Sequence, residues 1–143
     1  MKYLLISALV IFLTPVSEDP LIGKWKLKSN TMIAQIKNSP AFLDAEPDMQ
    51  ARMNKIFNTF LKEGEYHFKK DTLVYTDLMG TSIVRRRATW KRDDKIIQIK
   101  EIDRPLEREA QIVYLNGDSL VISPIIQGVI GKSKISFVRE GKD

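Results

Sequence analysis

The chain of 143 residues contains no cysteine and only one histidine, His67. Disulfides, cysteine-based metal sites and lipid acylation of a cysteine are therefore excluded, and sites built from several histidines are excluded too. There is also no glycine-rich phosphate loop and no long run of like charge. We therefore expect no enzyme activity, no metal, no cofactor and no nucleic-acid partner.

Two carboxylate pairs are the remaining candidates for acid–base chemistry. Asp93 and Asp94 lie in an expected turn, where aspartate is favoured for backbone reasons, and Glu107 and Glu109 are expected on the surface. His67 alternates with apolar neighbours in a strand-like run, so it is expected to face solvent. None of these groups indicates a catalytic site.

Long apolar runs are scarce, and the one present covers residues 3–13, after Lys2. It has the length of a signal-peptide core and is shorter than the roughly 20 residues that a membrane span needs. The sequence predicts a signal peptide at 1–17 and an exported protein, periplasmic or secreted, with no stable membrane span after cleavage. An uncleaved N-terminal anchor is the alternative. Losing Lys2 lowers the formal net charge of +5 by one, which leaves a mildly basic protein.

Residues 18–143 have the size of a single domain. A strand at 22–28 is predicted by strict alternation, and a helical insertion at 30–64 follows, with helices at 31–37 and 46–64. From residue 65 onward, apolar and polar residues alternate with a period of two. This pattern predicts seven further strands, at 65–69, 72–78, 82–92, 95–102, 108–115, 119–123 and 132–139.

Eight consecutive strands with short links are typical of an eight-stranded antiparallel up-and-down β-barrel, because closure removes exposed edges. A two-sheet sandwich is the structural alternative. The helical insertion between strands 1 and 2 carries an apolar stripe that includes Phe57 and Phe60. Either it is a lid that closes over the barrel mouth, or it packs on the barrel permanently.

One cation is expected on the inner face of the barrel. Arg86 shares a strand face with Trp90, whereas Arg85 and Arg87 point outward. An inward charge is costly unless it is paired or hydrated, so Arg86 either meets an internal carboxylate or binds an anionic ligand. The aromatic residues of the inner face either line a cavity or fill it. The candidate ligand-binding residues are Arg86, Trp90, Tyr66, Phe68, Tyr114, Phe57 and Phe60.

Several short motifs, spread over about residues 20–140, resemble the lipocalin-like members of the calycin superfamily, in particular small exported domains of bacteria. They are Gly23-x-Trp25, Tyr66-x-Phe68 with Asp71-Thr72, the strand around Trp90, Leu120-x-Ile122 after Asn116-Gly117, and Arg139 at the end of the last strand. The resemblance implies that Trp25 plugs the closed end of the barrel beside Gly23, with Arg139 packed across it. The long C-terminal helix and the disulfides of animal lipocalins are missing.

Two functions follow from this interpretation. The first is an exported barrel that binds a small hydrophobic or amphipathic molecule inside it, anionic if Arg86 takes part. The second is a solid-cored barrel whose outer surface binds an envelope protein or an acidic polymer through Lys69, Arg85, Arg87 and Lys91.

Overall fold

The computed structural model describes residues 17–141. The predicted signal peptide at 1–17 therefore lies outside the described residues, apart from Ser17. Within the described part, no helix combines the length and apolarity needed to cross a membrane.

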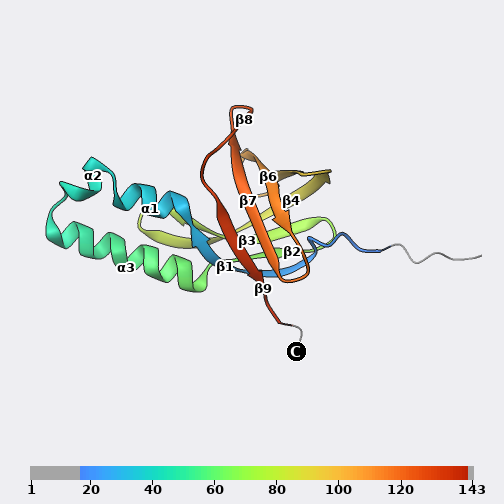
Figure 1. Cartoon of the computed structure of the whole chain (residues 1–143), viewed down its shortest axis with the longest axis horizontal. Helices are drawn as coiled ribbons and strands as arrows, with labels where there is room; N and C mark the ends of the chain where they lie inside the picture. The colour runs from blue at the N-terminus through green and yellow to red at the C-terminus, as the bar shows by residue number, and fades with distance from the viewer. Residues whose placement is uncertain (1–16, 142–143) are drawn as a thin grey trace, which may run out of the picture.

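The predicted strands and both predicted helices are present (Figure 1). The helices are α1 (Thr31–Lys37), α2 (Pro40–Leu43) and α3 (Pro47–Glu63). The strands are β1 (Gly23–Asn30), β2 (Glu65–Phe68), β3 (Thr72–Met79), β4 (Ser82–Asp93), β5 (Ile96–Glu101), β6 (Glu107–Leu115), β7 (Ser119–Ile126), β8 (Val129–Ile130) and β9 (Ile135–Arg139).

Strands β1 to β7 and β9 form a closed eight-stranded barrel in which every pairing is antiparallel. Strand β6 pairs with β7, and β9 pairs with both β7 and β1, which closes the sheet on itself. The predicted barrel is confirmed and the two-sheet sandwich is wrong. Strand β8 has two residues and, within the part of the chain that the structure describes, pairs only with the end of β7; the sequence pattern does not predict it.

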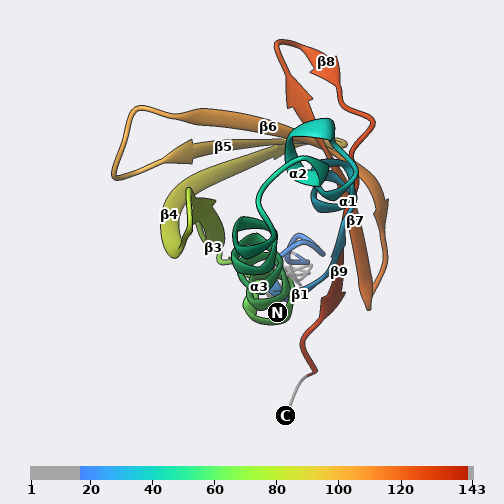
Figure 2. The ribbon, with the colours of Figure 1, turned by 90° about the vertical axis from the view of Figure 1, so that its left-hand side faces the viewer.

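The helical insertion also contains a helix that was not predicted. Ser39 Oγ accepts a hydrogen bond from the Phe42 backbone N–H (3.3 Å), and Pro40 occupies the first turn of α2. A serine cap followed by proline both ends one helix and starts the next. The three helices form an arm that projects from one end of the barrel (Figures 1 and 2).

Two separate apolar cores hold the molecule together. The larger one fills the barrel and combines inward side chains from all eight barrel strands. The smaller one lies within the arm, where Ile33, Phe42 and Phe57 are buried against one another and Leu78 is the contribution of the barrel. The arm thus has its own small core, and its helix α3 contacts strands β1, β3 and β4 of the barrel.

The end of the barrel opposite the arm is sealed by Trp25, which is 0% exposed. Its indole Nε1–H donates to the Leu21 carbonyl (2.8 Å), and the Arg139 guanidinium carbon lies 4.2 Å from the centroid of its ring. Arg139 also donates to the carbonyls of Pro20 (2.6 Å) and Ile22 (3.0 Å). These bonds fasten the N-terminal lead-in across the floor of the barrel, with the cation–π contact beneath them.

Candidate ligand site at the open end of the barrel

Aromatic side chains fill the interior above the floor. The Tyr66 ring centroid lies 4.8 Å from that of Phe137 and 5.2 Å from that of Tyr75, and Phe68 meets Trp90 edge-on at 5.2 Å. Beside Tyr66 a hollow of about 20 Å³ remains, which is room for about one water molecule. The sequence left open whether these rings line a cavity or fill it, and in this structure they pack against one another.

Tyr114 is not part of the interior, which corrects its prediction as a ligand-binding residue. Its side chain is 52% exposed, and it pairs with Val121 on the outer face. The register of β6 against β7 shifts between Ile112 and Tyr114, so one extra residue breaks the alternation. A β-bulge of this kind turns every later side chain to the opposite face.

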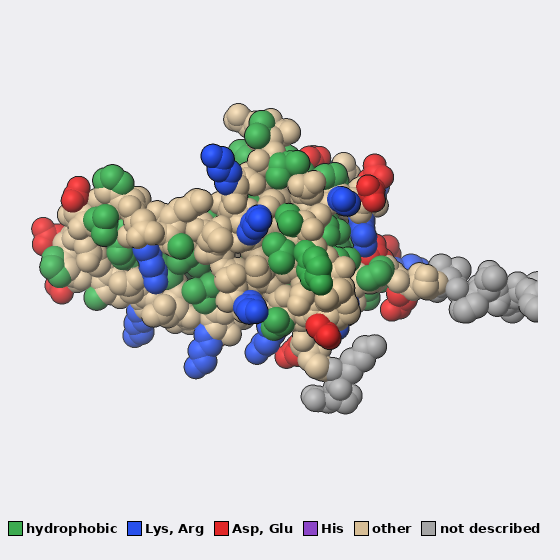
Figure 3. Space-filling model, viewed as in Figure 1, with side chains coloured by type: hydrophobic (Ala, Val, Ile, Leu, Met, Phe, Trp, Pro, Cys, Tyr) green, Lys and Arg blue, Asp and Glu red, His purple; other side chains and the backbone are tan. Residues whose placement is uncertain are grey.

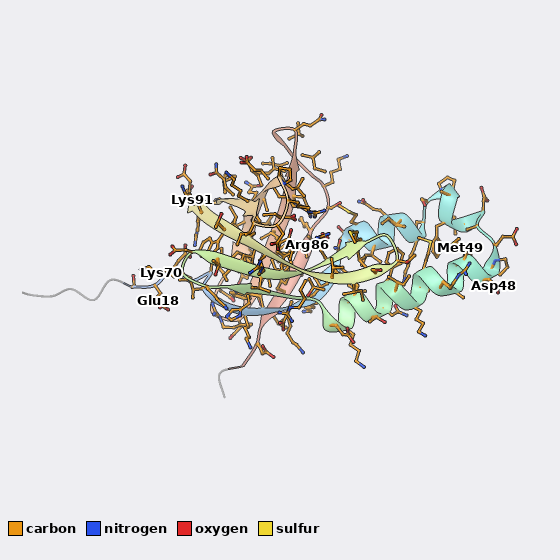
Figure 4. The ribbon with its side chains drawn as sticks, turned by 180° about the vertical axis from the view of Figure 1, so that it is seen from behind. Glu18, Asp48, Met49, Lys70, Arg86 and Lys91 are labelled. Atoms are coloured by element: carbon orange, nitrogen blue, oxygen red, sulfur yellow. The ribbon has the colours of Figure 1, made fainter. Side chains whose placement is uncertain are left out.

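The two phenylalanines of α3 have different surroundings. Phe57 is buried in the core of the arm, against Ile33 and Phe42. Phe60 lies one turn further along, where it lines the small hollow together with Leu27 and Tyr66. Met49, at the far end of the same stripe, is 43% exposed and lies at the tip of the arm (Figure 4). Only the last turns of α3 therefore face the barrel.

A network of charged side chains occupies the open end, on the inner face of the barrel wall. Asp77 and Glu101 lie toward the arm ends of β3 and β5, two residues beyond the buried Tyr75 and Ile99. Arg86 lies opposite Tyr75 on β4, and Figure 4 shows Arg86 near the arm, away from Lys70 at the other end. The carboxylates therefore lie at the level where the packed aromatic interior ends.

Glu101 is the most constrained member of this network. It is 5% exposed, accepts a hydrogen bond from the Tyr75 hydroxyl, and is bound by Arg104 through Nε and Nη2, the latter at 2.9 Å. Arg108 Nε lies 3.8 Å from its Oε1 atom. The hydrogen bond from Arg104 is the main reason why the pKa of Glu101 falls to about 2. Glu101 is thus a fixed negative charge at neutral pH.

Asp77 is shared among three arginines. Its Oδ2 atom lies 3.3 Å from Arg104 Nη2, 3.5 Å from Arg108 Nη2 and 3.7 Å from Arg86 Nε. Three guanidinium groups therefore face two carboxylates, and the network carries one uncompensated positive charge.

Arg86 is the least satisfied of the three arginines. Its side chain is 17% exposed, its Nη2 contacts the Met79 sulfur at 3.3 Å, and its Nε is buried. Within residues 17–141, this Nε is the one buried side-chain nitrogen or oxygen without a hydrogen-bond partner. A buried donor without an acceptor is unfavourable, and an incoming acceptor would relieve that cost.

The two tyrosine hydroxyls below the network remain protonated at physiological pH. Burial is the main reason why the pKa of Tyr66 rises to about 12, and Asp77 raises it while Arg108 opposes the rise. Burial, followed by the hydrogen bond to Glu101, also raises the pKa of Tyr75. Tyr66 therefore presents a neutral O–H donor at the top of the filled interior.

Four members of this network are not among the site residues predicted from the sequence: Asp77, Glu101, Arg104 and Arg108. Strand alternation could have found the two carboxylates, because Leu73, Tyr75 and Asp77 follow one another on the inner face of β3. Arg104 lies in the β5–β6 loop, and no periodic signal marks it.

The outer basic positions of the second function are partly neutralised. Arg85 pairs with Glu65 (2.9 Å) and Arg87 with Asp103 (3.0 Å). A groove of about 290 Å³ crosses the outer face of β4, β5 and β6, and its side chains include Lys91, with both signs of charge among the rest. This groove lies outside the barrel and is separate from the network at the open end.

Solved structures with a similar fold are known. This chain superposes on a lipocalin-like protein from Bacteroides uniformis ATCC 8492 with a TM-score of 0.53 and 13% sequence identity, covering 85% of this chain and 100% of that chain. The fold is lipocalin-like. An uncharacterized protein from Bacteroides eggerthii DSM 20697 gives a TM-score of 0.49 at 13% identity, over 83% of this chain and 98% of that chain. No family model and no curated protein matches the sequence.

Proposed function

We propose that this lipocalin-like protein is an exported binding protein, periplasmic or secreted, for a small amphipathic anion at the open end of its barrel. The observation that carries the proposal is the buried Nε of Arg86, which makes no hydrogen bond and lies 3.7 Å from Asp77 Oδ2, within a network that has one excess positive charge. A carboxylate, sulfate or phosphate group would accept a hydrogen bond from the Arg86 Nε–H and neutralise the excess positive charge.

We propose the small hollow beside Tyr66 as the place for the apolar part of the ligand. The hollow lined by Leu27, Phe60, Tyr66 and Phe137 is continuous with the contact between α3 and the barrel. Phe57 of α3 packs with Ile33 and Phe42 in a cluster separate from the barrel core, so a shift of the arm would leave the barrel core intact. We propose that such a shift enlarges the hollow for an alkyl or aromatic tail. The ligand would then sit at the mouth and not in the depth of the barrel.

Calorimetric titration of the delipidated protein with dodecanoate and with dodecanol tests the proposal, because the two ligands share a tail and differ in charge. The wild-type protein should bind dodecanoate more tightly than dodecanol. Arg86→Gln should weaken dodecanoate binding about tenfold or more, as expected for losing one charge-assisted hydrogen bond. The matched control is Arg87→Gln on the outer face of the same strand, which should bind dodecanoate like the wild type. Equal affinity of both ligands, or equal effects of the two substitutions, contradicts the proposal.

The small size of the interior hollow favours a second candidate function. With room for about one water molecule beside Tyr66, the barrel can also serve as a solid scaffold whose outer surface binds an envelope protein or an acidic polymer. Lys69 and Lys91 remain free for this role, because Lys100 is the only lysine within residues 17–141 that forms an ion pair. Crosslinking in intact cells should then capture a partner that Lys69→Gln/Lys91→Gln releases, whereas dodecanoate should not bind.

A further inference from the structure

The hairpin formed by the end of β7 and by β8 protrudes from the barrel and carries apolar side chains at its tip. Ile126 is 61% exposed, Val129 69% and Ile130 49%. Figure 1 shows the hairpin standing clear of the rest of the molecule, and Figure 3 shows hydrophobic side chains on the protrusion. Exposing several large β-branched side chains together to solvent is unfavourable, and such an exposed apolar patch is typical of an interaction site.

The core does not need this hairpin. Strand β7 already pairs with β6 and β9, so the barrel is closed without β8. The inner-face residues Leu120 and Ile122 of β7 belong to the main core, whereas none of the three tip residues packs against it. The tip residues therefore extend beyond the barrel and do not contribute to its apolar core.

The hairpin is also well ordered by its own hydrogen bonds. Ile125 pairs with Ile130 and Ile126 with Val129, and the Gly131 N–H donates to the Pro124 carbonyl (2.8 Å) at the base. The turn residues Gln127 and Gly128 both have positive φ, 52° and 75°, as a tight two-residue hairpin turn requires. The apolar tip is thus held in a fixed shape.

Basic residues follow directly at the base. Lys132 and Lys134 are exposed and lie two and four residues after Ile130, so extended chain places them within about 7 and 14 Å of it. Glu109, which pairs with Ile125, also lies at this base, so the side chains of Lys132, Lys134 and Glu109 together carry one net positive charge. The Lys134 backbone N–H donates to Thr31 Oγ1 (2.8 Å), which ties this loop to the start of α1.

We propose that this hairpin docks the protein on an anionic membrane surface. The tip residues Ile126, Val129 and Ile130 enter the boundary between head groups and acyl chains, while Lys132 and Lys134 lie at the level of the lipid phosphates. An apolar tip with a basic base matches the two layers of such a surface, and each contribution alone is too weak for stable binding. This proposal is independent of the ligand at the barrel mouth.

Co-sedimentation with vesicles tests the docking. The full protein is mixed with vesicles of 30% phosphatidylglycerol in phosphatidylcholine and with vesicles of phosphatidylcholine alone. Ile126→Ser/Val129→Ser should lower the partition coefficient on anionic vesicles by about tenfold or more, because two exposed branched side chains no longer leave water. Lys132→Gln/Lys134→Gln should lower it up to about fivefold per lysine. The matched control Leu43→Ser/Met49→Ser, which removes two exposed apolar residues from the arm, should leave it unchanged.

A second measurement locates the contact. Ile126→Trp should show a blue-shifted fluorescence that brominated lipids quench, whereas the buried Trp25 and Trp90 should not respond. The proposal is overturned if the serine variant binds like the wild type, or if phosphatidylcholine alone binds equally well. It is also overturned if sedimentation velocity without lipid shows a dimer that Ile126→Ser/Val129→Ser dissociates, because the tip would then be covered by a second copy of the chain.

Discussion

Replacing Trp25 by alanine should destabilise the protein more than any other single substitution at the closed end. The indole is fully buried, and truncating a buried large aromatic side chain costs about 3–5 kcal/mol. The upper half of that range is expected here for two reasons. The Leu21 carbonyl loses its N–H partner, and Arg139 loses the ring that it covers, a contact of about 1 kcal/mol.

Urea unfolding at pH 7, followed by the fluorescence of the remaining Trp90, measures this effect. Trp25→Phe is the control that separates ring from hydrogen bond: it keeps an aromatic ring but loses the Nε1–H donor, so it should cost about 1–3 kcal/mol. A loss below about 1 kcal/mol for Trp25→Ala would refute the sealing role of this residue. Equal losses for both variants would show that the hydrogen bond, and not the ring, closes the floor.

Three further predictions concern the floor and the charged network. Gly23 has a φ of +139°, and a methyl group there would collide with Arg139 Nη1. Gly23→Ala should therefore lower the free energy of unfolding in urea by about 1–3 kcal/mol. The control Gly117→Ala should lower it little, because the space around Gly117 is open. Because the pKa of Glu101 is lowered to about 2 from 4.5, its ionised form stabilises the fold fully above about pH 4.5 and loses this effect as the pH falls toward 2. The urea midpoint of Glu101→Gln should therefore change less than that of the wild type between pH 5 and pH 2.5, and a parallel decline would contradict the ion pairing. Absorbance titration should show the tyrosinate of Tyr66 forming near pH 12, and a Tyr66→Phe variant that still shows this transition would assign it elsewhere.

Alternation and turn signals were sufficient to predict the barrel, because each of its strands has one buried face and the links between them are short. The same alternation placed Arg86 on the inner face, whereas the family resemblance implied the burial of Trp25. It failed at Tyr114, where the bulge after Ile112 reverses the faces, since nothing in the local sequence marks the extra residue.

Other features depend on contacts between distant segments. Arg139 reaches carbonyls of the N-terminal lead-in more than a hundred residues away, and a family resemblance, not periodicity, suggested its position over Trp25. Arg104 belongs to the charged network but lies in a loop, where no alternation of apolar and polar residues predicts the direction of a side chain. Whether the aromatic rings fill the barrel or line it depends on side-chain packing in three dimensions, which composition alone does not determine.

The guanidinium NMR signal of Arg86 tests the proposed ligand site most directly. Dodecanoate is titrated into protein labelled with ¹⁵N at arginine, and the Nε–H resonance of each arginine is followed, with Arg86→Gln giving the assignment. The Nε–H of Arg86 should shift downfield in a saturable way as it gains an acceptor, with a smaller change at Arg108 and none at Arg85 and Arg87 on the outer face. A saturable shift confined to the outer arginines, or an Arg86 signal that never moves, would contradict binding at the open end of the barrel.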